Sequence, residues 1–328
     1  MAIRVAGKKP ARRRDVSSRE KVAQSSGWML RQSGELQILK STSLDKLGWL
    51  VHAFSTRQGG ASSLDGNLSG HGSNKMQGRV LNLGLTDWDS RENVIANRVK
   101  FFRAIDADKM RVVAVKQIHS DIVHCVNAAG PDHGSQASAA DALITREPGV
   151  LLVVQTADCV PILLADTKTR AVAAVHSGWR GTLRRIVEKT LGRMQIEFGT
   201  RPEDVVAAIG PAIGRCCYEV GSDVAREFHS QFPAAREWFD GPFDSLAAGE
   251  NDPNWLPWLT MMPPGHQPPT PTVQLDLFAA NRAILEGAGV NPGRIFSSDF
   301  CTACRTDLFF SYRKERATGR LMAAIGIR

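Results

Sequence analysis

The chain has 328 residues, a hydrophobic share of 43% and a formal net charge of +8. No apolar run reaches the roughly 18–20 residues that a membrane helix needs, and we expect no membrane partner. Six cysteines in a chain of this length do not form a disulfide-stapled scaffold, so a reducing cytoplasm is the expected compartment.

The positive charge is concentrated near the N-terminus. The first 21 residues hold eight Lys or Arg and two acidic residues, a net charge of +6. This stretch is poor in large apolar side chains, and we expect residues 1–35 to be a basic, disordered tail. The overall charge therefore does not predict a specific nucleic-acid partner. A non-catalytic protein that binds nucleic acid through this tail is a minor alternative.

The rest of the chain alternates between short apolar runs and amphipathic stretches. In chain order, we expect strands at 35–40 and 49–55, a loop insertion at about 61–80, a helix at 89–105, and strands at 112–116, 122–126, 151–155 and 171–175. These are followed by a helix at 183–198, a strand at 205–209, a helix at 222–232, a second insertion at about 233–273, a helix at 275–287, and strands at 295–300, 309–313 and 321–327. Because many strands follow one another without a helix, we expect an α+β fold of mixed β-sheets flanked by helices.

Three of the strands run into residues that commonly bind metals or react. His119 follows one strand, Cys159 follows 151–155, and His176 follows 171–175. Two imidazoles and one thiolate would suit a catalytic zinc, which keeps a fourth position open for water or substrate. Equally, Cys159 and His176 could form a nucleophile pair, with Asp158 or His119 orienting the imidazole. The residues alone leave both readings open.

Other polar residues near these strand ends could bind substrate or move protons. Arg180 begins a helix after His176 and is a candidate anion contact. Arg57, beside a Gly-Gly pair, is another, because a guanidinium forks onto phosphate. Asp141 and Asp158 are candidate acid–base groups, although an Asp at a turn is usually a local cap.

Cys301 and Cys304 form a C-x-x-C motif that could be half of a zinc site or a redox pair. No second C-x-x-C exists to complete a site of four thiolates, so we expect buried or structural thiols there.

Several long motifs resemble the YfiH-type family, also labelled the polyphenol oxidase or laccase-domain family and zinc-dependent purine nucleoside phosphorylases. They stand in the family's order from about residue 50 to 327: LNLG, VKQIHSD, QTADCVPILLAD, AVHSGWRGTL, IGPAIGRCCYEVG, LDLFAANRAIL and FFSYRKERATGRLMAAIGI. The resemblance implies one catalytic domain over 36–328 with a layered α/β/β/α arrangement. The two insertions depart from the family pattern and could reshape the mouth of the site.

The resemblance also implies a catalytic Zn²⁺ bound by His119, Cys159 and His176. The implied activities are phosphorolysis of adenosine, inosine, guanosine and methylthioadenosine, together with adenosine deamination. A nucleoside and phosphate are the implied partners of a monomer or homodimer. As a hypothesis for the mechanism, Asp158 or a water would relay protons, and the substrate contacts would come from four side chains: Arg57, Asn82, Gln117 and Arg180.

Two alternatives to this function follow from the same motifs. Some bacterial relatives are implicated in editing peptidoglycan precursors, so a cysteine or zinc hydrolase is possible, with Cys159 as nucleophile. Multicopper oxidase chemistry is disfavoured, because such enzymes hold copper largely in His-x-His pairs, and none of the eight His here has that spacing. Copper is accordingly a less favoured metal than zinc.

Overall fold

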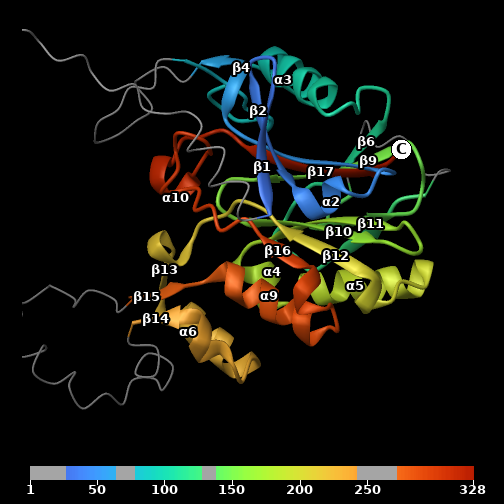
Figure 1. Cartoon of the computed structure of the whole chain (residues 1–328). Helices are drawn as coiled ribbons and strands as arrows, with labels where there is room; N and C mark the ends of the chain where they lie inside the picture. The colour runs from blue at the N-terminus through green and yellow to red at the C-terminus, as the bar shows by residue number, and fades with distance from the viewer. Residues whose placement is uncertain (1–26, 64–77, 128–137, 242–271) are drawn as a thin grey trace, which may run out of the picture.

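The structure, a computed structural model, describes residues 27–63, 78–127, 138–241 and 272–328. Within these residues, two six-stranded mixed sheets lie one above the other (Figure 1). The strands of the first sheet, in spatial order, are β1 (Trp28–Ser33), β2 (Leu36–Ser41), β3 (Leu50–Ser55), β17 (Leu321–Ile327), β9 (Val150–Thr156) and β6 (Arg111–Ala114). Those of the second are β16 (Ile295–Ser297), β12 (Val205–Ile209), β10 (Val160–Asp166), β11 (Val172–Ser177), β8 (Ala142–Thr145) and β7 (Val123–Cys125).

Smaller elements surround the two sheets. A three-stranded sheet contains β13 (Glu219–Gly221), β15 (Thr272–Leu275) and β14 (Phe239–Asp240), and β4 (Gln58–Ser63) pairs with β5 (Arg79–Val80). The α-helices are α2 (Thr42–Asp45), α3 (Arg91–Ala104), α4 (Trp179–Leu183), α5 (Ile186–Phe198), α6 (Ser222–Gln231), α9 (Leu277–Gly287) and α10 (Tyr312–Glu315). Short 3₁₀ turns are η1 (Pro202–Asp204), η2 (Arg215–Cys217), η3 (Ala235–Trp238) and η4 (Pro292–Arg294).

The central strands are buried on both faces, which is why they are continuous apolar runs and do not alternate with polar residues. In β9, Leu152 and Val154 belong to the core between the two sheets, whereas Leu151 and Val153 pack with Phe101 of α3 on the outer side. Successive side chains of a strand point to opposite faces, so one strand contributes to both cores.

The second sheet has the same arrangement with helices on its other side. Leu163 of β10 faces the first sheet, while Leu164 packs in a core shared with Met194 of α5 and Leu285 of α9. The order is therefore helix, sheet, sheet, helices, with α3 above and α5 and α9 below in Figure 1. This confirms the predicted α+β fold of mixed sheets in a layered α/β/β/α arrangement.

The predicted tail at residues 1–35 ends too late. Residues 1–26 lie outside the described residues, but Trp28–Ser33 form β1, which pairs with β2. The side chain of Trp28 is 0% exposed, and its indole Nε1 donates to the carbonyl of Ser297 in the second sheet at 2.8 Å. This stretch belongs to the fold because a single buried tryptophan links both sheets.

The two predicted insertions also contain ordered elements at their ends. Of residues 61–80, the described part continues β4 and contains β5, while 64–77 lie outside the described residues. Of residues 233–273, the described parts contain η3, β14 and the start of β15, and 242–271 lie outside. Strand pairing between the ends of each loop explains this, since it needs no long apolar run in either segment.

Three further expectations about local structure are wrong. The helix expected at 183–198 is broken where Arg185 takes a left-handed φ of 57°, between α4 and α5. The strand expected at 309–313 is a turn followed by α10, which Ser311 caps by accepting from the amide of Lys314. Strand β10 is not among the expected strands. It contains Pro161, which has no amide hydrogen but is tolerated near the start of a strand.

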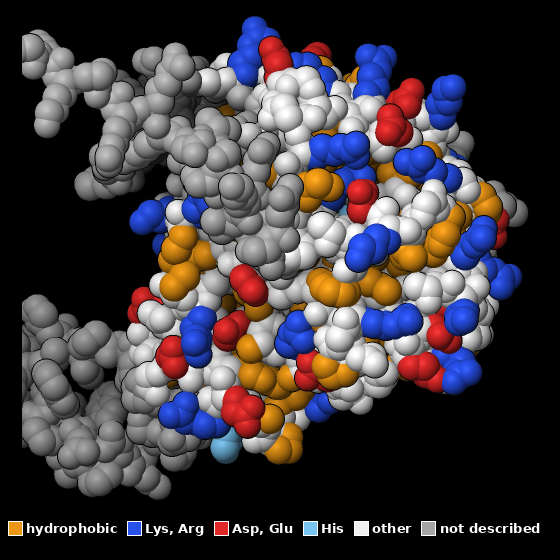
Figure 2. Space-filling view, viewed as in Figure 1, with side chains coloured by type: hydrophobic (Ala, Val, Ile, Leu, Met, Phe, Trp, Pro, Cys, Tyr) orange, Lys and Arg blue, Asp and Glu red, His pale blue; other side chains and the backbone are white. Residues whose placement is uncertain are grey.

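Among the described residues, no helix is both long and apolar enough to cross a membrane. Figure 2 shows Lys and Arg interleaved with Asp and Glu over the described part of the face drawn there. On that face, basic side chains are not gathered into one patch.

The role of β1 can be tested by replacing Trp28 with Ala. We expect Trp28→Ala to lower the free energy of unfolding by about 3–5 kcal/mol, because a fully buried aromatic ring and its hydrogen bond are lost. Arg31→Ala, at an exposed position of the same strand, should change it by less than about 0.5 kcal/mol. Urea titration of both variants measures this change. An equally small effect of Trp28→Ala would show that β1 does not stabilise the fold.

Candidate metal centre

Two of the three predicted ligands lie on segments that connect the two sheets, and the third lies at the end of a strand. His119 is on the segment from β6 in the first sheet to β7 in the second, and Cys159 is on the segment from β9 to β10. His176 is the next-to-last residue of β11, which pairs with β10. Two crossovers and a strand end therefore meet at one end of the sandwich.

The ligand atoms of His119, Cys159 and His176 all lie within 4.8 Å of one another. The Cys159 Sγ is 3.9 Å from His119 Nε2, and the two imidazole rings meet edge-on with centroids 4.9 Å apart. A tetrahedral zinc with ordinary bond lengths sets a thiolate sulfur and an imidazole nitrogen roughly 3.6 Å apart. The observed spacing therefore fits one shared ion.

The cluster extends from the interior of the protein to its surface. The imidazole of His176 is 4% exposed, Cys159 is half-buried, and His119 is exposed. Three protein ligands with an accessible side are the arrangement of a catalytic zinc, whose fourth position takes water or substrate.

Gly178 provides the room that the cluster needs. A Cβ atom at this position would lie 2.9 Å from Cys159 Sγ and 3.3 Å from His119 Cδ2. Only a residue without a side chain lets the backbone come this close to the ligands. The tight space around the sulfur supports the fit of these residues to a metal ion.

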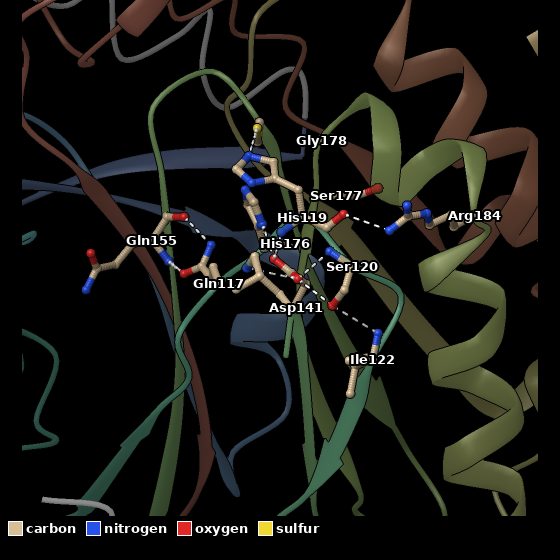
Figure 3. A network of polar contacts seen from close by, with 12 residues as sticks. Gln117, His119, Ser120, Ile122, Asp141, Gln155, His176, Ser177, Gly178 and Arg184 are labelled. Atoms are coloured by element: carbon tan, nitrogen blue, oxygen red, sulfur yellow. Dashed lines mark hydrogen bonds and ion pairs between the residues drawn. The ribbon is translucent and has the colours of Figure 1, made fainter. Parts of the chain in front are cut away.

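Asp141 organises the cluster from beneath, as Figure 3 shows. Its carboxylate accepts a hydrogen bond from His176 Nδ1 at 2.9 Å. The other ring nitrogen of His176, Nε2, is then the one that can bind a metal ion. It also accepts from the amides of Ile118, His119 and Ser120 at 3.2, 3.0 and 2.6 Å. The His119 segment and the His176 ring are thus held by one buried carboxylate.

The electrostatics of the cluster favour a thiolate. Burial opposes ionisation of Asp141, but the hydrogen bonds from His176 and Ser120 hold the pKa of this carboxyl below its usual value. Burial alone would raise the pKa of Cys159, but the nearby charge of His176 and the contact with His119 lower it to about 6. The pKa of His176 rises to about 9, because Cys159 and Asp141 outweigh its burial. A metal must displace the His176 proton, so its affinity should increase with pH.

Asp158 supports the Cys159 segment. It has a left-handed φ of 96°, and its two carboxylate oxygens accept from Thr302 Oγ1 and from the amide of Arg313, both at 2.6 Å. These bonds hold the strained backbone next to Cys159 in place. The predicted proton-relay role of Asp158 stays a prediction, with both oxygens already engaged.

Two of the predicted substrate contacts bond to other parts of the protein. Arg57 is buried, and its guanidinium donates to Glu315 and to the carbonyl of Thr306, at 2.8 and 2.6 Å. Asn82 is fully buried, donates to Asp89 and accepts from the amide of Arg320. A guanidinium already neutralised inside the protein is a poor phosphate contact, so the structure does not support the role predicted for Arg57.

Gln117 lies near the cluster but fixes the backbone. Its amide donates to the carbonyl of Gln155 and accepts from the amide of the same residue, both at 2.7 Å (Figure 3). It therefore ties the segment that carries His119 to β9. Gln155 is the next-to-last residue of β9, close to the segment that carries Cys159.

Positive charge does lie beside the centre. Arg180 is exposed in α4, with its guanidinium 4.4 Å from the centre of the Trp179 ring. Arg184, which no sequence pattern indicated, donates to the His119 carbonyl at 3.4 Å (Figure 3). It follows Arg180 by four residues, and this spacing puts both on one helical face.

Tyr218 is a second residue that the sequence did not indicate. Burial and then the charge of Cys159 raise the pKa of its phenol, so the hydroxyl stays protonated near the thiolate. The Arg313 guanidinium lies 5.0 Å from the centre of its ring. The motif IGPAIGRCCYEVG contains this tyrosine, but no spacing rule connects it to Cys159.

Replacing Gly178 with Ala tests whether the cluster is a metal site. The added methyl group would displace Cys159 Sγ, and we expect zinc affinity to fall by roughly 10-fold or more. Gly192→Ala is the matched control, because a Cβ there meets nothing within 4 Å and should leave zinc binding unchanged. Competition with a chelator measures both, and equal affinities would contradict a metal at this point.

Comparison with known proteins relates this site to a family. Residues 51–328 match the family model described as multi-copper polyphenol oxidoreductase laccase. A protein of Bacteroides thetaiotaomicron named purine nucleoside phosphorylase is 33% identical over 305 residues, covering 91% of this chain and 99% of the relative. One of Deinococcus radiodurans with the same name is 37% identical over 278 residues, covering 84% and 88%.

Solved structures show the same fold. The Bacillus licheniformis hypothetical protein YfiH aligns with a TM-score of 0.73 and 28% identity, covering 91% of this chain and 99% of that chain. YlmD from Geobacillus stearothermophilus aligns with a TM-score of 0.68 and 30% identity, covering 91% and 98%. The chain therefore belongs to the YfiH-type, laccase-domain family, in which the Bacteroides and Deinococcus relatives are named purine nucleoside phosphorylases.

Proposed function

We propose that this protein is a zinc-dependent purine nucleoside phosphorylase that also acts on methylthioadenosine and deaminates adenosine. The observation that supports it most is the convergence of His119, Cys159 and His176 within 4.8 Å, on an open side of the protein. Nucleoside and phosphate are the proposed partners. A cytoplasmic location and a monomeric or homodimeric state remain predictions.

The three ligands would hold the zinc ion through two imidazole nitrogens and one thiolate. When bound, zinc supplies positive charge and a Lewis acid at its open position. Asp141 keeps His176 in the orientation that binding needs, and a tautomer with Nδ1 protonated follows from its carboxylate.

Phosphorolysis needs a phosphate oriented toward the sugar. In this reaction a phosphate oxygen bonds to C1′ of the ribose, and the bond from C1′ to the purine nitrogen breaks. Arg180 and Arg184 are the proposed phosphate contacts, because both carry positive charge on α4 or directly after it, and Arg184 reaches the His119 backbone. A guanidinium binds phosphate through charge-assisted hydrogen bonds.

The departing purine must gain a proton. Tyr218 is the proposed donor, because a phenol is protonated at neutral pH and this one lies close enough to Cys159 to be influenced by its charge. In deamination, water adds to C6 of adenine and ammonia leaves, so no phosphate takes part. Asp158, which directly precedes Cys159, is proposed to relay protons there through a water.

The second candidate is a cysteine or zinc hydrolase that edits peptidoglycan precursors. The observation that favours a cysteine mechanism is the lowered pKa of Cys159, about 6, because the thiolate is the reactive form. In that case activity would survive metal removal and would be lost on alkylation of Cys159.

A nucleoside panel with Cys159→Ala tests the proposed function. The parent enzyme should release free purine only with phosphate, and should form inosine from adenosine without it. Cys159→Ala should lose both activities together with bound zinc, whereas Cys125→Ala, at a free thiol on β7, should keep them. Free base and inosine are measured by chromatography. Full activity of Cys159→Ala, or metal-free activity of the parent, would refute the proposal.

Replacing Arg180 with Ala separates the phosphate contact from the metal. We expect the KM for phosphate to rise by roughly 10–100-fold, the loss of one charged hydrogen bond, while adenosine deamination changes little. Arg193→Ala, which removes an exposed ion pair with Glu197 on α5, should alter neither. Steady-state kinetics of both reactions check this, and a parallel loss of deamination would show that Arg180 does not act through phosphate.

A further inference from the structure

Four cysteines outside the first centre come together in the structure. Cys216 and Cys217 lie in η2, while Cys301 and Cys304 form the C-x-x-C motif after β16. Their sulfur atoms all lie within 4.8 Å of one another, although more than 80 residues separate the two pairs in sequence. The sequence predicts buried or structural thiols at Cys301 and Cys304, but only Cys301 is buried, and Cys304 is exposed. The adjacent pair Cys216-Cys217 drew no prediction, because it lacks the usual ligand spacing.

The sulfur separations match those of ligands around one ion. Cys304 Sγ is 3.5 Å from Cys216 Sγ and 3.4 Å from Cys217 Sγ, and all four cysteines are free thiols. A tetrahedral zinc with four thiolates has sulfur–sulfur edges of roughly 3.8 Å. A polynuclear iron–sulfur cluster would hold its thiolates farther apart, because irons and sulfides lie between them.

The backbone is shaped around these sulfurs. The amide of Gly214 donates to Cys301 Sγ at 3.2 Å, a bond that favours a thiolate. A Cβ at Gly214 would lie 3.1 Å from Cys301 Cβ and 3.4 Å from Cys216 Sγ. As at Gly178 in the first centre, a side chain would intrude on the ligands.

The neighbouring cations are already paired with carboxylates. Arg215 lies 3.2 Å from Asp240 and 3.9 Å from Asp276, and Arg305 donates to Asp307 at 2.8 Å through two nitrogens. These guanidinium groups therefore do not balance several thiolates. A bound divalent cation would neutralise the thiolates that bind it.

We propose that Cys216, Cys217, Cys301 and Cys304 bind one zinc ion in a closed, structural site. Four protein ligands leave no open position, in contrast to the first centre. The ion would fasten together two segments that already share a backbone bond, from the Thr302 amide to the Ala212 carbonyl at 2.9 Å.

The proposed four-cysteine site lies beside Asp158, the residue that supports the Cys159 segment. Both fastened segments bond to Asp158: the Ile213 amide donates to its carbonyl at 2.8 Å, and Thr302 Oγ1 donates to its carboxylate at 2.6 Å. Because Asp158 precedes Cys159, the structural zinc would stabilise the segment that presents a ligand of the first centre.

The test is the zinc content per chain of five proteins purified without added metal. We expect two zinc ions in the parent and in Cys125→Ser, one in Cys304→Ser, one in Cys159→Ala, and none in the double variant of Cys159 and Cys304. Cys304 is exposed, so its replacement by Ser leaves the buried core unchanged. If Cys304→Ser fails to fold, Cys216→Ser, also exposed, takes its place.

The two centres are distinguished by the same set. If only the first-centre proposal fails, Cys159→Ala keeps the parent's zinc and Cys304→Ser still loses one ion. If Cys304→Ser and Cys216→Ser keep the parent's zinc, the four-cysteine site is refuted. Cobalt substitution of Cys159→Ala gives an independent readout, with strong thiolate-to-cobalt absorption expected. Absence of that absorption, or a disulfide within the cluster in anaerobically prepared protein, would also overturn the proposal.

Discussion

The carboxylate of Asp141 is fully buried and accepts hydrogen bonds from both halves of the candidate metal centre. On one side it binds His176 Nδ1, and on the other it binds three consecutive amides around His119. A buried carboxylate with fewer donors would be costly, so the surrounding loop is held to the one conformation that satisfies it. The position of two ligands depends on this residue, and so does the tautomer of one of them.

The layered fold explains why the ligands meet. Each sheet is covered by helices on its outer face, so the chain crosses between sheets at the ends of strands. Two such crossings carry His119 and Cys159, and β11 ends with His176 beside them. The strands determine where the ligands lie, while Arg180 lies in helix α4 and Arg184 directly follows that helix.

Much of this architecture could be predicted from the sequence. Runs such as 151–155 and 171–175 indicated buried strands; β9 covers the first run, and β11 covers the second from residue 172. The convergence of His119, Cys159 and His176 required the family resemblance, because separations of 40 and 17 residues follow no local rule. Pattern rules failed where tertiary pairing decides, as in β1 and in the break at Arg185.

The substrate contacts show a different limit. Arg57 and Asn82 stand in polar, glycine-rich sequence that is typical of binding loops, yet their side chains bond to the C-terminal part of the chain, to Glu315 and the Arg320 amide. Likewise, Asp141 was only one of two candidate acids, and the adjacent cysteines drew no prediction. In each case the partner lies far away in sequence, so no pattern of neighbours could reveal the role.

The most direct test of the account is the zinc affinity of Asp141→Asn. The amide would set an N–H group against the donors that now surround the carboxylate, and we predict roughly 10–100-fold weaker zinc binding at the first centre. Asp121→Asn, at a nearby acid that pairs with Lys189 on the surface, should bind zinc as the parent does. Affinities measured by chelator competition in a Cys304→Ser background report the first centre alone. Equal affinity of Asp141→Asn and the parent in that background would contradict the central role of Asp141.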